Sequence, residues 1–360
     1  MRKTVAIVGA TGIAGQQFIV SLQNHKWFKI KKLAASEKSA GRSYQEAIQN
    51  PNSGTMRWWS PERPNKEILN MEVENAGNLD AEEVDIVFSA VESDAALSLE
   101  PRYAKTTPVI STASAFRYDE DVPILVPGVN LEHTELIRIQ KRNRSWQGFV
   151  TPIPNCTVTG LVIALKPIYD AFGLDKVLMT SMQAVSGAGR SPGVLSLDIQ
   201  DNIIPFIPKE EEKVQKEALK ILGKLNIGKV DNANLKVSAT CTRVNVSDGH
   251  TESVFLSTKK PCSVEEVTEE LRNFGKDFVR IGLPSAPREM IVVHEDQDRP
   301  QPRIDRDIYN GMATSVGRIR KDNVLENGIK FVLLSHNTKM GAAKGATLIA
   351  EYLIKKGYIK

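Results

Sequence analysis

One cysteine of this chain lies in polar residues that favour a turn. An apolar, strand-like run at residues 148–150 precedes Cys156, and a helical pattern at residues 161–168 follows it. This order predicts that the thiol lies where a strand ends and a helix begins, with Thr157 or Thr159 available to cap the helix. Free backbone N–H groups and the positive end of the helix dipole would favour a thiolate there. The same N–H groups would hold an oxyanion if the sulfur attacked a carbonyl group.

A lone cysteine is more often buried and unreactive than catalytic. We accept that interpretation for Cys241 and Cys262. For Cys156 the polar flanks favour a nucleophile.

A histidine supplies a partner for such a nucleophile. His250 directly follows an Asp-Gly pair and therefore lies at the junction of a loop and a strand, not on an apolar face. This position favours a catalytic role. His25, His133 and His294 have no such context, and we expect them at the surface.

A glycine-rich loop near the N-terminus indicates a nucleotide site. It lies between an apolar strand at residues 4–8 and a helical stretch at residues 16–23, as in the first turn of a βαβ unit. Gly9 would permit the tight turn, Gly12 would let the backbone approach a pyrophosphate, and Gly15 would let the helix pack on the strand.

The end of the second predicted strand, at residues 28–33, bears on the choice of cofactor. A fold that prefers NAD usually carries an acid there for the ribose hydroxyls. This segment instead offers Ser36, Lys38 and Ser39, with Glu37 as its one acid. Hydroxyl and cationic donors suit a 2′-phosphate, so we expect NADP, although a solvated loop would look similar.

The elements around these residues alternate between strand and helix in the first part of the chain. Strands at 84–90 and 108–111 enclose a helix at 93–104, which predicts a doubly wound parallel sheet. Beyond Cys156 strand patterns dominate. We expect them at 176–185, 235–245, 254–257, 290–293, 313–319 and 328–334, with helices at 209–217, 263–275 and from 341 onwards.

From the residues alone, two charged features are expected to face solvent. Arg117 lies in a polar loop and is expected at the surface, and the helix at 209–217 reads as a solvated face. The glycine-rich loop at 186–193 would let backbone approach a ligand closely.

Composition limits the class of protein. A length of 360 residues suffices for two domains, and 41% hydrophobic with 25% charged residues is ordinary for a soluble globular chain. The net charge is +4 and the sequence has no basic tail, so nucleic acid is not an expected partner. Three separated cysteines indicate a reducing compartment and offer no zinc-ligand spacing, so no metal is expected. No signal peptide or membrane-spanning run is evident, and we expect a cytoplasmic protein.

These parts combine into one chemistry. A thiolate would attack an activated acyl group, a hydride from NADPH would reach the thioester, and an aldehyde would leave. The alternative from another class is a nucleotide-binding regulator or scaffold with a structural Cys156. Alkylation separates the two, because only the catalytic interpretation predicts a thiol more reactive than Cys241 and Cys262 at neutral pH.

Taken together, the motifs resemble those of aspartate-β-semialdehyde dehydrogenases of the archaeal and fungal type, over essentially the whole chain. The residues that carry the resemblance are the Gly9–Gly15 loop, the Ser36–Ser39 segment, residues 114–117, residues 154–157, Gln183 with residues 186–189, the Glu-Glu-Lys helix, Arg243 with residues 249–251, and Asn337 with residues 341–343.

The resemblance implies an α/β fold with two domains. Residues 1–155 would form a Rossmann-type NADP-binding domain, completed by a C-terminal helix at 340–360. Residues 156–339 would form an α+β catalytic and dimerisation domain with a mixed sheet. The family implies a homodimer or homotetramer.

The resemblance also implies roles that the residues alone leave open. Cys156 matches the nucleophile, His250 the general acid/base, and Gln183 the residue that orients the acyl-enzyme. Substrate contacts are implied for Arg243 (carboxylate), Glu210 (amino group), and Lys213, Arg117 and Asn155 (phosphate). Cofactor contacts are implied for Gly9, Thr11, Gly12, Ile13, Ser36, Lys38, Ser39, Ser186, Gly187 and Asn337.

The implied reaction is NADPH-dependent conversion of L-aspartyl-4-phosphate to L-aspartate-4-semialdehyde, in the synthesis of lysine, threonine and methionine. The alternative is a malonyl-CoA or succinyl-CoA reductase of similar fold. Such an enzyme needs no group for a substrate amine, so residues 154–157 and 210–213 favour the amino-acid substrate.

Overall fold

The protein is described here by a computed structural model that covers residues 2–189 and 193–360. Its contacts divide the chain into two compact units. The first unit comprises Met1–Pro123, Thr134–Ile153 and Ala346–Lys360, and the second comprises Ile124–His133 and Pro154–Gly345. The predicted first domain, residues 1–155, includes residues 124–133, which the structure groups with the second unit. Of the predicted loop at 186–193, residues 190–192 lie outside the described residues.

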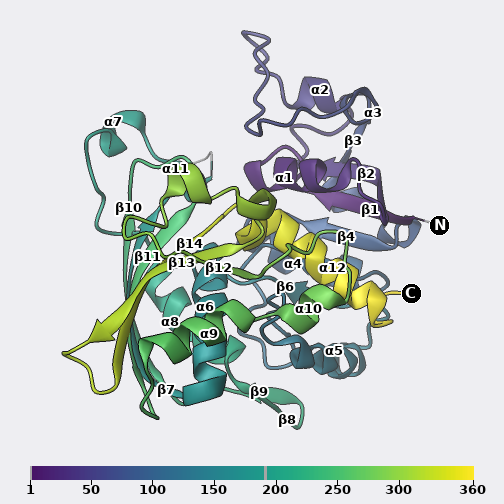
Figure 1. The fold of residues 1–360 in the computed structure, drawn as a ribbon. Coiled ribbons are helices and arrows are strands. Elements are labelled where there is room, and N and C mark those ends of the chain that lie inside the picture. Colours follow the sequence, from purple (N-terminus) through teal and green to yellow (C-terminus); the bar gives the residue numbers. More distant parts are fainter. Residues whose placement is uncertain (1, 190–192) are drawn as a thin grey trace. The chain divides into compact units, whose positions relative to one another are not determined.

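The first unit is built on a six-stranded parallel sheet with the order β3-β2-β1-β4-β5-β6 (Figure 1). Its strands are β1 (Lys3–Val8), β2 (Phe28–Ala35), β3 (Val73–Asn75), β4 (Ile86–Ser89), β5 (Val109–Ser111) and β6 (Val150–Pro152). Its helices are α1 (Ile13–Leu22), α2 (Tyr44–Ala47), α3 (Lys66–Leu69), α4 (Ser93–Ala104), α5 (Leu136–Arg144) and all but the first two residues of α12 (Lys344–Lys355). This strand order is that of a Rossmann-type fold, which confirms the predicted class.

The apolar run at the start of the chain explains the centre of this sheet. Val5, Ile7 and Val8 have no exposed surface, as expected for a strand that is covered on both faces. The C-terminal helix α12 returns to this unit, where Glu351 accepts a hydrogen bond from His25 over 2.8 Å.

The second unit contains a mixed six-stranded sheet with the order β10-β7-β11-β14-β13-β12. The pairs β10/β7 and β13/β12 are parallel, and the three pairs between them are antiparallel. Its strands are β7 (Leu174–Gln183), β10 (Lys236–Arg243), β11 (His250–Thr258), β12 (Ile291–Val293), β13 (Thr314–Asp322) and β14 (Gly328–Ser335), and a separate hairpin is formed by β8 (Lys224–Asn226) and β9 (Lys229–Asp231). Its helices are α6 (Cys156–Phe172), α7 (Ser196–Ile199), α8 (Glu210–Ile221), α9 (Val264–Asn273), α10 (Lys276–Arg280) and α11 (Pro302–Asp305).

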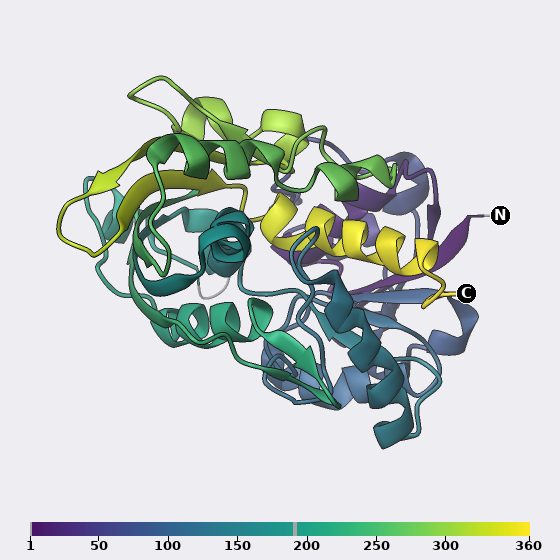
Figure 2. The same ribbon diagram turned by 60° about the horizontal axis from the view of Figure 1, so that its bottom comes forward.

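Three helices cover one face of this mixed sheet, with α6 between α8 and α9 (Figures 1 and 2). Helix α6 is buried along most of its length. A Cβ atom at Gly160 would overlap the side chain of Ser335, so only glycine allows the helix to lie this close to β14. The N-terminal part of α6, which begins at Cys156, therefore lies next to the end of β14 at Ser335.

Two predicted surface histidines are in fact buried, so those expectations are wrong. His25 bonds Glu351, 326 residues further along the chain, and the ring of His133 lies between Asn130 and the carbonyl of Gly223. Glu351 lies 326 residues from His25 and Gly223 lies 90 residues from His133, so the local sequence pattern does not reveal these contacts.

Among the described residues, no helix is long and apolar enough to cross a membrane.

Candidate active site

Cys156 is the first residue of α6, directly after its N-cap Asn155. The side-chain Oδ1 of Asn155 accepts hydrogen bonds from the backbone N–H groups of Thr157 (2.9 Å) and Val158 (3.3 Å). The position of the cysteine at a helix start is therefore confirmed, but the cap is Asn155, not Thr157 or Thr159. The thiol is partly exposed and lies in the field of the helix N-terminus, which favours its ionised form.

His250 lies opposite this thiol. It is the first residue of β11 and fully buried, and its Nε2 lies 3.2 Å from Cys156 Sγ. On the other side of the ring, Nδ1 accepts a hydrogen bond from the backbone N–H of Ala184 over 3.1 Å. Burial, the guanidinium of Arg243 and the ring of His336 lower the pKa of His250 to about 3. The structure thus brings together the predicted nucleophile and the predicted histidine.

The register of the sheet places two further predicted residues beside His250. Arg243 ends β10 and pairs with Gln183, which ends β7, while His250 begins the antiparallel neighbour β11. These strand ends meet at the same edge of the sheet. Arg243 Nη1 donates to the carbonyl of Ala184 over 2.8 Å, so this arginine and His250 are held by the same residue.

Glu210 is the centre of a hydrogen-bond network at the start of α8. Its Oε1 accepts from Asn155 Nδ2 (2.8 Å) and Gln183 Nε2 (3.1 Å), and the hydroxyl of Thr157 lies 3.4 Å away. Lys213 Nζ lies 3.7 Å from the other oxygen, Oε2. The structure therefore joins three predicted substrate residues, Glu210, Asn155 and Lys213, with the predicted catalytic residue Gln183. The solvated interpretation of this helix is wrong for its buried side.

Sequence reasoning missed Glu217 on the same helix. It has no exposed surface, and its Oε2 accepts the backbone N–H of Asn155 over 2.7 Å. A signal exists in the sequence, because Glu210, Val214 and Glu217 follow helical spacing along one buried stripe.

Arg117 belongs to the first unit and is also buried, contrary to the surface position expected from its loop. Its guanidinium donates to the carbonyls of Ile153 (3.0 Å) and Thr112 (2.9 Å). A buried arginine held by two carbonyls is a fixed cation rather than a solvated one.

The glycine loop of the first unit has two glycines that the fold requires and one that it does not. Gly9 has a φ of +82°, and a Cβ atom at Gly15 would overlap the Gly9 backbone. Gly12 is the N-cap of α1, has no side-chain cap, and would meet nothing closer than 3.5 Å with a Cβ atom. The open position next to Thr11 and Ile13 leaves uncapped N–H groups of a helix N-terminus for an anion.

The remaining predicted cofactor residues form two groups, one in each unit. Ser36 and Lys38 are exposed, and Ser39 is half-buried, in the turn directly after β2. In the second unit Asn337 bridges two segments: its Nδ2 donates to Ser186 Oγ over 2.8 Å, and its Oδ1 accepts from Gly249 N–H over 2.9 Å. Gly187 lies in the same turn as Ser186 (Val185–Ala188).

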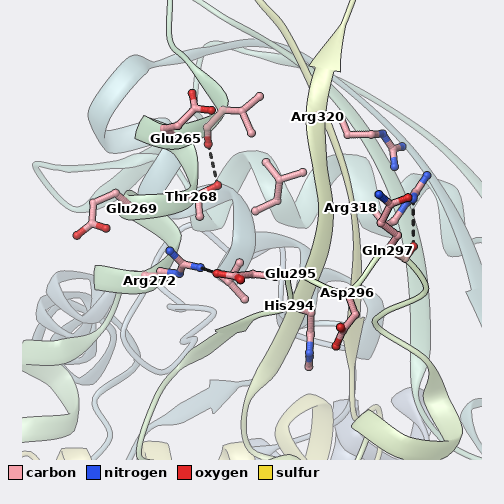
Figure 3. Close-up of a pocket in the computed structure, with 13 residues that line it drawn as sticks. Glu265, Thr268, Glu269, Arg272, His294, Glu295, Asp296, Gln297, Arg318 and Arg320 are labelled. Carbon is pink, nitrogen blue, oxygen red and sulfur yellow. Dashed lines mark hydrogen bonds and ion pairs between the residues drawn. The ribbon is translucent and has the colours of Figure 1, made fainter.

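The second unit also contains a cavity of about 710 Å³, which is separate from the site of Cys156 and His250 (Figure 3). It lies between α9, β12 and β13, and none of the predicted site residues lines it. Two of its arginines have partners within the cavity wall: Arg272 pairs with Glu295, and Arg318 donates to the backbone carbonyl of Gln297. The chemistry predicted from the sequence therefore does not lie in this cavity. Among the described residues no group of His, Cys, Asp and Glu side chains is arranged to hold a metal ion.

The sequence and the fold are similar to those of known proteins. Residues 4–137 match the family of the semialdehyde dehydrogenase NAD binding domain, and residues 165–340 match the semialdehyde dehydrogenase dimerisation domain. The chain is 47% identical to the aspartate-semialdehyde dehydrogenase of Archaeoglobus fulgidus, with both chains covered completely. It is 40% identical to that of Saccharomyces cerevisiae, with 99% of each chain covered. The chain therefore belongs to the aspartate-semialdehyde dehydrogenase family, which confirms the resemblance noted in its sequence.

Solved structures support the same conclusion. The aspartate-semialdehyde dehydrogenase of Candida albicans, solved with NADP, superposes with a TM-score of 0.89 at 39% identity, covering 99% of this chain and all of the other. Aspartate-semialdehyde dehydrogenase II of Vibrio cholerae, complexed with ASA, gives a TM-score of 0.77 at 28% identity and 99% coverage of both chains.

Proposed function

We propose that this protein is an aspartate-semialdehyde dehydrogenase that reduces L-aspartyl-4-phosphate to L-aspartate-4-semialdehyde with NADPH. The observation that carries the proposal is the 3.2 Å approach of Cys156 Sγ to His250 Nε2 at the start of α6, beside Arg243. Family membership supplies the substrate and cofactor class.

The chemistry follows from the thiolate. Cys156 attacks the acyl carbon, a C–S bond forms, and the C–O bond to phosphate breaks. When bound, the nicotinamide cofactor supplies the hydride that reduces the resulting thioester. The oxyanion of the reduced thioester then collapses: the C–S bond breaks, the Cys156 thiolate is restored and the aldehyde is released. The positive end of the α6 dipole favours negative charge near Cys156 in both stages. The N–H groups of Thr157 and Val158 already donate to Asn155 Oδ1, so they are not donors for the oxyanion that the sequence led us to expect.

The cluster around Glu210 suits an amino-acid substrate. Two amide donors and a nearby hydroxyl point at Oε1. Lys213 lies 3.7 Å from Oε2, and within the described part of the chain we propose this oxygen as the acceptor for a substrate ammonium group. Arg243 presents a guanidinium fork for the substrate carboxylate. Gln183 bonds Glu210 and pairs with Arg243 across β7 and β10, and we propose that it orients the acyl group. Lys213 and Arg117 keep their proposed role toward phosphate.

Asn155 has a narrower role in our proposal than the resemblance implied. Its Oδ1 caps α6 and its Nδ2 bonds Glu210, so most of its amide is already used within the protein. We infer that Asn155 sets the position of Cys156 and contacts the phosphate only with its remaining N–H.

The chain's residues fit an NADP cofactor. Gly12 leaves the N-terminus of α1 open for a pyrophosphate, and Ser36, Lys38 and Ser39 offer donors for a 2′-phosphate after β2. We assign Gly9, Thr11, Ile13, Ser186, Gly187 and Asn337 to the same function on the basis of the family.

We also propose a homodimer or a homotetramer, in the cytoplasm. The family description of residues 165–340 as a dimerisation domain supports an oligomer. On the mixed sheet, Leu178 and Phe255 are exposed beside a cavity of about 340 Å³, which suits an apolar contact.

The test is a comparison of substrates with the purified enzyme and NADPH. We expect turnover of aspartyl phosphate and formation of an acyl-enzyme whose added mass is absent from Cys156→Ala. Turnover of malonyl-CoA or succinyl-CoA with no turnover of aspartyl phosphate would refute the proposal.

A further inference from the structure

The segment between α2 and α3, residues 48–65, is a long excursion of the first unit (Figure 1). The buried side chain of Gln16, in the first turn of α1, attaches this excursion to the glycine loop. Its Nε2 donates to the carbonyls of Thr11 (3.2 Å) and Arg57 (2.8 Å), and its Oε1 accepts the backbone N–H of Trp59 over 2.9 Å. The main chain from Arg57 to Trp59 is therefore held close to the start of α1.

Two aromatic rings form a second attachment. Tyr44, the first residue of α2, is fully buried, and its hydroxyl donates to the carbonyl of Ala10 in the glycine loop over 2.9 Å. Trp58 packs edge-on against this ring, with the two centroids 6.5 Å apart. The N–H of Arg57 donates to the carbonyl of Ile48 over 2.7 Å, so both main-chain polar groups of Arg57 are bonded. These contacts fix the main chain of Arg57 beside the loop.

The side chain of Arg57 differs from its main chain, because its Nε is buried and has no hydrogen-bond partner among the described residues. A buried donor without an acceptor is unfavourable, so this nitrogen indicates an acceptor that the protein itself does not supply. A guanidinium offers several N–H donors in one plane, an arrangement that suits the oxygens of a phosphate group.

The start of α1 favours an anion as well. Its N-cap Gly12 provides no side-chain cap, and the first turn carries no acidic side chain that would neutralise the helix dipole. Gln16 bonds both the loop and Arg57, so a fixed cation is attached to the same place where backbone N–H groups are open to a phosphate.

We propose that Arg57 binds a phosphate group of NADP, and that Gln16 is the positioning residue that holds Arg57 beside the glycine loop. This inference deepens the cofactor site proposed above and rests on it. The motifs of the sequence assigned cofactor contacts to the glycine loop and to the turn after β2, and they gave no function to the excursion.

The test is a calorimetric titration of the purified full-length enzyme with NADPH and with NADH, in the absence of substrate. The variants are Arg57→Gln and the matched control Arg63→Gln, which removes the same charge from an exposed side chain of the excursion. We expect Arg57→Gln to raise the Kd for NADPH by about tenfold or more, the loss typical of a hydrogen bond to a charged group. Arg63→Gln should change that Kd by less than about threefold, because solvent and salt screen an exposed charge. An unchanged Kd in Arg57→Gln, or an equal rise in both variants, would overturn the inference.

The two cofactors identify which phosphate Arg57 contacts. NADH has the pyrophosphate and lacks the 2′-phosphate. A similar rise in Kd for both cofactors assigns Arg57 to the pyrophosphate, and a rise confined to NADPH assigns it to the 2′-phosphate. Either result supports a phosphate contact.

A double-mutant cycle tests the positioning role of Gln16. Gln16→Met keeps the length of the side chain and removes its hydrogen bonds. We expect Gln16→Met to weaken NADPH binding in the wild-type background and to have little further effect in Arg57→Gln. Additive losses would contradict the positioning role, and so would a lowered Tm with an unchanged Kd.

The inference and the function proposed above can fail separately. An Arg57→Gln enzyme that binds NADPH as tightly as wild type would refute the role of Arg57 and leave the dehydrogenase function standing. A wild-type enzyme that does not bind NADPH would refute the cofactor assignment itself.

Discussion

Replacing Glu252 by glutamine should make the protein more stable at alkaline pH. Glu252 lies on β11, two residues after His250 and opposite Ser181 of β7, and it has no exposed surface. Neither of its carboxylate oxygens has a hydrogen-bond partner among the described residues. Burial and the nearby charge of Glu210 raise the pKa of Glu252 well above its ordinary value.

The sign and size of the effect follow from linkage. Above an ordinary value of 4.5 the carboxyl of the unfolded chain loses its proton, while that of the folded chain keeps it. The folded state then binds more protons, so the free energy of unfolding falls as pH rises, until pH reaches the folded-state pKa. The slope is at most about 1.4 kcal/mol per pH unit, or about 2.7 kcal/mol between pH 6 and pH 8. Glutamine has nearly the shape of the neutral acid and does not titrate, so this contribution disappears in Glu252→Gln.

The assay is unfolding by denaturant at a series of pH values and at one fixed protein concentration, for wild type, Glu252→Gln and the exposed control Glu120→Gln. We expect the wild-type and Glu252→Gln curves to diverge with rising pH, and wild type and Glu120→Gln to stay parallel. A difference between wild type and Glu252→Gln that is constant with pH would mean that Glu252 is ionised in the folded protein, and the reasoning would be wrong.

Three further predictions concern catalysis. Cys156→Ala should abolish turnover while titration still shows NADPH binding, because the nucleophile is lost and the nucleotide site is not; activity within about tenfold of wild type would contradict this. The enzyme should prefer NADPH, since Ser36, Lys38 and Ser39 offer donors and Glu37 is the one acid; equal kcat/KM with NADH would refute it. His250→Asn should lower kcat by about two to four orders of magnitude with little change in KM, because a general acid/base acts mainly in the chemical steps. Arg243→Lys should raise KM, because lysine keeps the charge and loses the bidentate fork. Steady-state kinetics that show the reverse pattern would overturn both roles.

The sequence predicted those parts of the protein that depend on local pattern. The strand at residues 4–8 could be read because a parallel strand covered on both faces is continuously apolar, and β1 is buried there. The helix at 93–104 agrees with α4 at both ends. Cys156 could be placed at a helix start because the change from an apolar run to polar residues and then to helical spacing is itself local.

The parts that could not be predicted depend on contacts between distant residues. Arg117 is buried because two carbonyls accept its guanidinium, one of them from Ile153, 36 residues away. The charged helix α8 has a buried side because Asn155 presents a backbone N–H to Glu217 and an amide to Glu210. The partner of His250 Nδ1 is a backbone amide, which every residue except proline possesses, so no side-chain pattern could identify Ala184.

Two buried carboxyls in the second unit show how the same side chain can receive opposite functions. Glu210 lies at the start of a helix, with donors from Asn155 and Gln183 on one oxygen and Lys213 near the other, an arrangement that suits an anion. Glu252 has no donor among the described residues, and the charge of Glu210 opposes a second anion nearby. Burial and the charge of Glu210 raise the pKa of Glu252 and favour its neutral form, whereas the donors around Glu210 suit the role toward a substrate ammonium that we propose for it. The charge of the pocket therefore depends on which donors reach each carboxyl and not on how many acids the sequence supplies.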